Sequence, residues 1–173
     1  MTAASRTAGP AAQAARLAAE VADRAVRLGW SVGTAESLTS GSVAAALGAA
    51  PSASTWFRGS VVAYASEVKF DLLEVPEGPV VSSGAALTMA KAAAALLSAD
   101  LVVAVTGAGG PDPQDGQPPG TVWFGVVWPH GKSVEERFFD GPPERVVAEA
   151  TAHALQIACR ALRPPRDERP APT

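Results

Sequence analysis

The sequence predicts an α/β protein: a three-layer α/β/α sandwich around a mostly parallel, mixed sheet. Segments with helical spacing alternate along the chain with short apolar strands, the pattern of helices that cover both faces of a sheet. Near the end, two strands follow one another across a short turn, which indicates one antiparallel hairpin. The chain has 173 residues, 47% of them hydrophobic and 18% charged, enough for one such domain with a substantial core.

Five segments have the composition and spacing of helices. In residues 11–28, apolar side chains recur at helical spacing and Gly29 follows as a C-cap. In the segment 82–99, Ser82 or Ser83 suits the N-cap. The segment 142–163 begins with prolines, which are favoured in a first turn. After residues 11–28 the segments are a small-residue helix that ends near Gly48, then residues 66–73, 82–99 and 142–163.

Five short apolar segments are expected to be strands, namely residues 30–36, 57–65, 100–107, 121–128 and 132–140. The turn Pro129, His130 and Gly131 joins the last two. Between residues 107 and 120, Gly and Pro fill more than half of the positions, so neither helix nor strand is expected there. A loop of this length is often a binding loop or a lid, and the sequence leaves open whether this one is.

One domain is expected over residues 11–162, between disordered stretches at 1–10 and 163–173. Lys and Arg number 14 and Asp and Glu number 17, and a net charge of −3 argues against a general nucleic-acid binder. The single Cys159 excludes an intramolecular disulfide and suits a small core residue. No segment has the length and apolarity of a membrane span or a signal peptide, which predicts a cytoplasmic protein.

Candidate nucleophiles gather in residues 34–41, where a strand, a polar turn and a helix are predicted to follow each other. This layout exposes a hydroxyl beside the free N–H groups of a helix start, where an oxyanion can be held. Ser37, Thr39 and Ser40 are the candidates. Serine and threonine at a junction of strand and helix are mostly N-caps, so this stretch alone is weak evidence for a nucleophile.

A serine nucleophile needs a base. One of the two histidines, His130, lies in a turn and the other, His153, lies within a helix, so a Ser-His-Asp triad is poorly supported. Lys69 follows an apolar strand and becomes a base if burial keeps its amine neutral. The alternative is a surface lysine whose stem lies along apolar side chains.

An ordered set of motifs resembles the CinA C-terminal domain family. The resemblance runs from about residue 11 to 162, and the set is more specific than any one motif. It is similar to the stand-alone form of the family rather than to the C-terminal extension of a larger competence-associated protein. The motifs are TAESLTSG at 34–41, FRGSVVAYASEVK at 57–69, Val81-Ser82, TGAGGPD at 106–112 and GTVWF at 120–124.

The resemblance implies a nicotinamide-nucleotide amidase, which hydrolyses nicotinamide mononucleotide to nicotinic acid mononucleotide and ammonia in pyridine-nucleotide salvage. It implies a Ser–Lys arrangement with no metal and no organic cofactor, and a small-molecule nucleotide as the partner. Ser37 matches the serine of the family and Lys69 its lysine. Tyr64 matches the tyrosine of the second motif, with an expected role in orienting Lys69 or donating to the substrate.

On this hypothesis, further residues of the same motifs bind the substrate. The N–H groups around 39–41 are expected to hold the oxyanion, and the loop 107–120 is expected to line the pocket. The implied substrate-binding residues are Glu36, Thr39, Ser40, Gly41, Thr106, Gly107, Gly109, Gly110 and Arg145.

The sequence departs from the family pattern at the start of the last helix. Two arginines of the family are replaced by Pro143 and Val147, and Ser40 stands where the family has glycine. Arg145 is therefore predicted to bind the substrate phosphate. Two alternatives are an amidase for a different small amide and a non-catalytic ligand-binding or interaction protein. The sequence leaves a homo-oligomer open.

Overall fold

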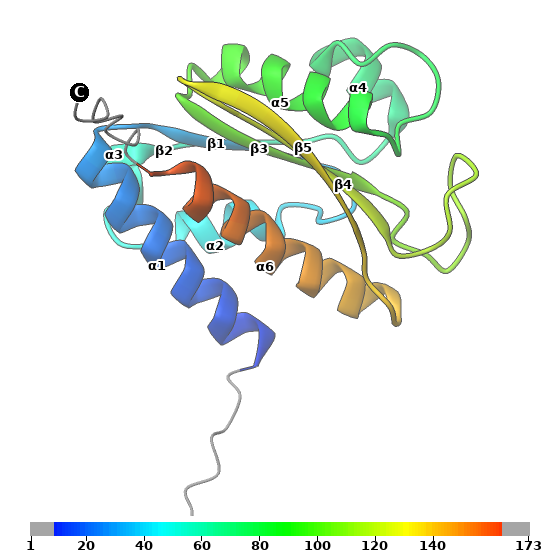
Figure 1. Ribbon diagram of the computed structural model, residues 1–173, viewed down its shortest axis with the longest axis horizontal. Coiled ribbons are helices and arrows are strands. Elements are labelled where there is room, and N and C mark those ends of the chain that lie inside the picture. The colour runs from blue at the N-terminus through cyan, green and yellow to red at the C-terminus, as the bar shows by residue number, and fades with distance from the viewer. Residues whose placement is uncertain (1–8, 164–173) are drawn as a thin grey trace, which may run out of the picture.

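The computed structural model describes residues 9–163 as helices on both faces of a five-stranded sheet (Figure 1). The ends predicted to be disordered lie almost wholly outside this range. The elements are α1 (Pro10–Leu28), β1 (Val32–Glu36), α2 (Ser42–Gly48), α3 (Ala53–Trp56), β2 (Phe57–Val62), α4 (Ser66–Leu73), α5 (Ser83–Leu97), β3 (Leu101–Gly107), β4 (Thr121–Trp128), β5 (Gly131–Phe138) and α6 (Pro143–Ala161).

The strands lie in the order β2-β1-β3-β4-β5. β1 pairs in parallel with β2 and with β3, whereas β4 pairs antiparallel with both β3 and β5. Within residues 9–163, β4 therefore runs against the other four strands. The predicted α/β class with a mostly parallel, mixed sheet is confirmed, and the carboxyl ends of β1, β2 and β3 meet at one edge.

Helices α1, α2 and α6 cover one face of the sheet, and α4 and α5 cover the other (Figure 1). The alternation of side chains along β4 separates the two cores. Val122, Phe124 and Val126 pack with α1 and α6, whereas Val127 packs with α5. Ser82 caps α5, since its hydroxyl accepts a hydrogen bond from the Ala85 N–H at 3.2 Å.

One short helix, α3, is missed by the sequence analysis. It has four residues, too few for a helical periodicity to show. Trp56 stabilises it from within the core, because its buried indole donates a hydrogen bond from Nε1 to the Pro51 carbonyl at 3.0 Å. The structure also ends β2 at Val62, three residues earlier than predicted, so Tyr64 lies beyond the strand.

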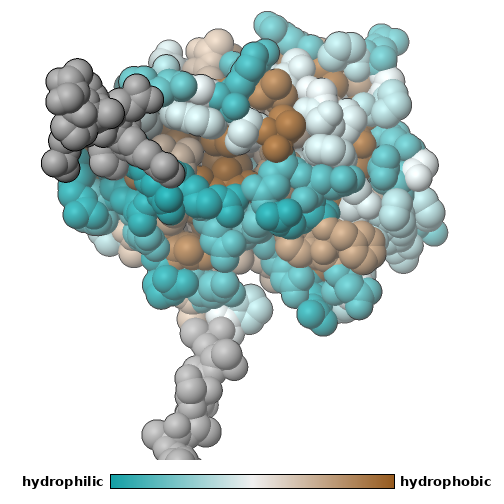
Figure 2. Space-filling view, in the orientation of Figure 1, coloured by the Kyte–Doolittle hydropathy of each residue, from teal (hydrophilic) through white to brown (hydrophobic). Residues whose placement is uncertain are grey.

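No helix within residues 9–163 combines the length and the apolar character needed to cross a membrane. On the face drawn in Figure 2, hydrophobic residues reach the surface in separate areas between hydrophilic side chains.

Candidate active site

Ser37 follows β1 directly and begins the turn that leads into α2. Its N–H donates to the Val105 carbonyl of β3 at 2.9 Å, and its own carbonyl accepts from the Ser40 N–H at 3.0 Å. These two bonds fix the backbone of the residue. Its hydroxyl has no hydrogen-bond partner within residues 9–163, and the side chain is only 7% exposed. Ser37 is therefore a rigidly placed serine with an uncommitted hydroxyl.

The carboxylate of Glu36, the residue before Ser37, holds the turn in place. It accepts hydrogen bonds from the N–H groups of Gly41, Val43 and Ala44 at 3.0, 3.2 and 2.8 Å. The Thr39 hydroxyl also donates to it, at 2.8 Å. Glu36 is fully buried, and its charge complements the positive end of α2. The predicted substrate-binding role of Glu36 is thus replaced by a structural one, because its carboxylate is already engaged.

The amides predicted to form an oxyanion hole are only partly free. The N–H of Ser40 is bonded to the Ser37 carbonyl and that of Gly41 to Glu36. Within residues 9–163, the N–H groups of Leu38 and Thr39 have no partner. Of the amides expected at 39–41 only that of Thr39 is free, and the N–H of Leu38, directly after Ser37, is a second available donor.

Lys69 lies on α4 and is 1% exposed. Its Nζ donates to the Tyr64 carbonyl at 2.8 Å and to the Ala65 carbonyl at 3.5 Å. These carbonyls follow the end of β2, the strand that pairs in parallel with β1 next to Ser37. No hydrogen bond joins Lys69 to Ser37 in the described part of the chain. The Ser37 hydroxyl and the Lys69 amine therefore lie beyond the ends of neighbouring parallel strands, with no hydrogen bond between them.

Burial lowers the pKa of Lys69 from its ordinary value of 10.5, because the charged ammonium loses its hydration. The carboxylates of Asp115 and Glu67 oppose this effect and raise the pKa of Lys69. A lysine in this environment holds a neutral amine at lower pH than a surface lysine does, which is what a general base requires. The alternative of a surface lysine is therefore wrong.

Asp115 fastens the glycine- and proline-rich loop to the segment before α5. Its Oδ2 accepts from the N–H groups of Val80 and Val81, at 2.6 and 2.9 Å. The hydroxyl of Thr106, at the end of β3, donates to the Val80 carbonyl at 2.8 Å. Thr106 is thus a buried structural residue. Nothing in the sequence singles out Asp115, since its partners lie more than 30 positions away.

A pocket of about 370 Å³ opens above Ser37 at the carboxyl ends of the parallel strands. This is where ligands bind in open α/β sheets. Gly107 lines it where a side chain is excluded, because a Cβ there would lie 2.6 Å from the Thr121 carbonyl oxygen. The lining consists of Ser37 and Leu38 after β1, Tyr64 after β2, Gly107 and residues 109–114 after β3, and Pro143 and Val147 of α6.

Five of the predicted site residues thus share one pocket, namely Ser37, Tyr64, Gly107, Gly109 and Gly110. Arg145 does not line it, which argues against the predicted phosphate contact. Its side chain is 60% exposed, and its Nε donates to Glu149 at 2.8 Å along the surface of α6. The reason is geometric: each helical residue turns by about 100°, so Pro143 and Val147 face the pocket and Arg145 does not.

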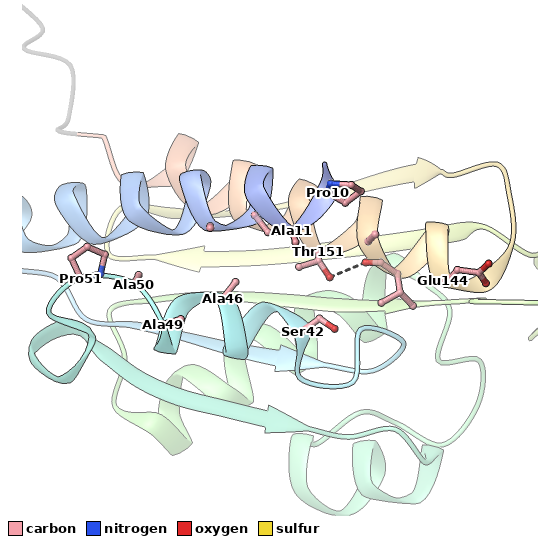
Figure 3. Close-up of a pocket in the computed structure, with 13 residues that line it drawn as sticks. Pro10, Ala11, Ser42, Ala46, Ala49, Ala50, Pro51, Glu144 and Thr151 are labelled. Atoms are coloured by element: carbon pink, nitrogen blue, oxygen red, sulfur yellow. Dashed lines mark hydrogen bonds between the residues drawn. The ribbon is translucent and has the colours of Figure 1, made fainter. Parts of the chain in front are cut away.

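A larger pocket of about 510 Å³ lies between α1, α2 and α6. Figure 3 shows alanines of α1 and α2 around it, and Thr151 donating from its hydroxyl to a carbonyl of α6. That acceptor is Val147, at 2.8 Å. Apart from Glu144, the lining holds no titratable group. Its polar side chains are this one carboxylate and the hydroxyls of Ser42 and Thr151, and among the described residues no Lys or His lines it as a base.

The remaining reactive side chains lie away from the Ser37 pocket. His153 packs against Phe124, with ring centroids 4.9 Å apart, and bonds to Glu135 at 2.7 Å. Cys159 is buried, and burial raises its pKa to about 11, so it is an unreactive core thiol. Within residues 9–163, no group of three or more His, Cys, Asp and Glu side chains is arranged to hold a metal ion.

Comparison with known proteins identifies the class. The family model described as the CinA C-terminal domain matches residues 14–162. The chain belongs to this family. A CinA-like protein of Frankia casuarinae is 38% identical over 133 residues, which are 74% of this chain and 31% of that protein. The chain spans about a third of the length of the curated relatives it matches.

Solved structures of the family have the same fold over most of the chain. The competence damage-inducible protein A (ComA) of Klebsiella pneumoniae is 35% identical with a TM-score of 0.82, covering 86% of this chain and 96% of that one. The competence/damage inducible protein CihA of Agrobacterium tumefaciens is 30% identical with a TM-score of 0.79, covering 86% and 96%.

Proposed function

We propose that this chain is an amidohydrolase that cleaves the carboxamide of a nicotinamide nucleotide or nucleoside, with Ser37 as nucleophile and Lys69 as base. The mononucleotide is the substrate that the family resemblance implies. The observation that carries the proposal is the placement of two groups at the ends of adjacent parallel strands. One is the uncommitted Ser37 hydroxyl in a pocket, and the other is a buried lysine with a lowered pKa.

The proposed reaction has two steps, acylation of Ser37 and hydrolysis of the acyl-serine ester, and neither step requires a cofactor. The neutral amine of Lys69 takes the Ser37 proton as Oγ bonds to the carboxamide carbon. The C–N bond then breaks, and the leaving ammonia takes that proton. Water, deprotonated by the same amine, attacks the acyl-serine ester and releases the carboxylate and the serine. For the acylation step the Lys69 amine exchanges its hydrogen bond to the Tyr64 carbonyl for one to the Ser37 hydroxyl. Such a catalytic hydrogen bond often forms fully only when substrate is bound.

The negative oxygen of the tetrahedral intermediate needs preorganised donors. The unpartnered N–H groups of Leu38 and Thr39 follow the nucleophile directly and are suited to this role. Their direction is fixed by the bonds of Glu36 to α2. Loss of one such donor in other hydrolases costs about 10²–10³ in rate.

Ammonia release from nicotinamide mononucleotide and from its riboside tests the proposal, with glutamine as a control amide. We expect Ser37→Ala to lower the rate by about 1000-fold or more, because the covalent step is lost. Ser42→Ala is the matched control, since Ser42 lies close by on α2 but outside the Ser37 pocket. Turnover by Ser37→Ala above a few per cent of wild type refutes the nucleophile. Absence of turnover by the wild type favours the non-catalytic alternative.

A further inference from the structure

The charge of the Ser37 pocket is unusual for a site that takes a phosphate ester. Among the lining residues, all within the described part of the chain, Asp112 is the one acidic residue. No Lys, Arg or His side chain lines the pocket. A phosphate monoester brings a charge of about −1.5 to −2 at pH 7. Its stable binding calls for cationic or N–H donors.

The cations nearest in sequence to the lining are committed elsewhere. The Arg145 guanidinium is paired with Glu149 on the outer side of α6. The Lys69 ammonium or amine is held on the carbonyls of Tyr64 and Ala65 and is the proposed base. Neither is free to neutralise a phosphate in the pocket.

The start of α6, where Pro143 lines the pocket, offers little to an anion. Pro142 and Pro143 have no N–H, and the N–H groups of Arg145 and Val146 both donate to the Pro142 carbonyl. Glu144 adds a carboxylate to the first turn. The positive end of the helix therefore already faces a carboxylate, and within the described residues the Glu144 N–H is the one amide of this first turn left without a partner.

Two groups in the pocket favour a cation instead. The Asp112 side chain lies in the exposed part of the loop, and Tyr64, which is 71% exposed, also contributes to the lining. A carboxylate attracts a positive charge, and the face of an aromatic ring does the same. With a carboxamide at Ser37, the rest of the ligand occupies the part of the pocket that contains residues 109–114 and Val147.

We infer, on the basis of the proposed function, that the preferred substrate is a phosphate-free, positively charged pyridinium carboxamide, a nicotinamide nucleoside rather than its 5′-phosphate. The pyridinium ring is a cation that Asp112 and Tyr64 complement. The phosphate of the mononucleotide meets a carboxylate in the same pocket and no cationic side chain among the described lining residues.

Calorimetric titration of the Ser37→Ala protein with nicotinamide riboside, nicotinamide mononucleotide and nicotinamide tests the inference apart from catalysis. We expect the riboside to bind about tenfold more tightly than the mononucleotide at low salt, with a smaller ratio at high salt. Equal or tighter binding of the mononucleotide overturns the inference. Should Ser37→Ala not fold, the ratio of KM values for ammonia release by the wild type gives the same decision.

Failure of the two proposals can be told apart. Ammonia release with the mononucleotide preferred overturns the inference and leaves the amidohydrolase standing. Preferential binding of the riboside without ammonia release from either compound supports the inferred ligand and refutes the hydrolysis.

Two variants test which residues of the pocket make the protein prefer the riboside to the mononucleotide. Asp112→Asn is expected to weaken the riboside about fivefold and leave neutral nicotinamide unchanged. Asp71→Asn removes an exposed carboxylate of α4 outside the pocket and serves as its control. Val147→Arg is expected to tighten the mononucleotide selectively, whereas the long but neutral Val147→Met does not. An unchanged riboside-to-mononucleotide ratio in both Asp112→Asn and Val147→Arg refutes the inference.

Discussion

Lys69 is an ionisable side chain held where water hardly reaches it. Its ammonium form loses hydration and gains two carbonyl acceptors, at 2.8 and 3.5 Å, in return. The balance lowers the pKa of Lys69, although two carboxylates act in the opposite direction. A surface lysine would bind protons too tightly at neutral pH to act as a base, so the burial of this residue is a functional matter as well as a structural one.

If Lys69 is the base, a positive charge at position 69 is not sufficient for activity. Lys69→Arg keeps a cation but cannot lose its proton, and Lys69→Met keeps the shape without the amine. We expect both to lower the rate of ammonia release by at least about 100-fold. Rates across a pH series, with circular dichroism to verify folding, make the measurement. If Lys69→Arg retains most of the activity, Lys69 is an electrostatic partner and not the base.

At the scale of elements, α2 is held to the sheet by one carboxylate. Glu36 lies at the end of β1 and accepts from three N–H groups of the turn and of α2. The hydroxyls of Thr39 and Ser60 add two donors from further along the chain. This arrangement joins strand, turn and helix, and so places Ser37 and the amides after it.

Glu36→Gln is expected to destabilise the protein by about 3 kcal/mol, because an amide has one acceptor oxygen and turns an NH₂ toward N–H donors. Thermal unfolding is then expected at a temperature roughly 6–12 °C lower. Glu149→Gln removes a surface carboxylate on α6 and is expected to cost less than about 1 kcal/mol. Equal stability of Glu36→Gln and Glu149→Gln contradicts the structural role.

The loop after β3 is coupled to the proposed base through Asp115. This carboxylate anchors the loop on Val80 and Val81 and raises the pKa of Lys69. Removal of its charge therefore favours the neutral amine at lower pH. We expect the acidic limb of the profile of kcat/KM against pH to move to lower pH in Asp115→Asn.

Asparagine is the suitable replacement, because Asp115 has a φ of 52° and asparagine tolerates this left-handed backbone. Asp71→Asn, two residues from Lys69 on α4, is the control and is expected to leave the limb in place. If Asp115→Asn lowers the rate at every pH and the acidic limb of the kcat/KM profile does not move, Asp115 only anchors the loop.

At the scale of the whole molecule, the sequence was sufficient for the layers but not for the details of the site. Apolar periodicity predicted α1, prolines in a first turn indicated α6, and β4 was predicted with the bounds that the structure shows. The role of Glu36 could not be predicted, since its donors come together only when β1 and α2 pack. The position of Arg145 outside the pocket lining could not be predicted either, because a position in a motif does not tell which side of a helix faces a pocket.

The close approach of α5 to the sheet determines the distance between two layers, and Gly125 permits it. A Cβ at Gly125 would lie 2.8 Å from the Leu87 nitrogen and nearer still to the Ala86 carbonyl. These are backbone atoms of α5, which cannot turn aside as a side chain can. Gly125→Ala must therefore push the helix outward from a core that includes Met89, Ala90 and Ala93.

We expect Gly125→Ala to lower the free energy of unfolding by about 2 kcal/mol or more, measured by urea denaturation. Gly84→Ala adds the same methyl group to α5 at a position where nothing lies within 4 Å. It is expected to change stability by less than about 1 kcal/mol, and toward greater stability, since alanine restricts the unfolded chain. The comparison separates the effect of the contact between the layers from that of adding a methyl group at an open position. If both variants unfold at the same urea concentration as the wild type, β4 and α5 are not in the close contact that Gly125 permits. That contact also holds the segment before α5 against Asp115 and Thr106.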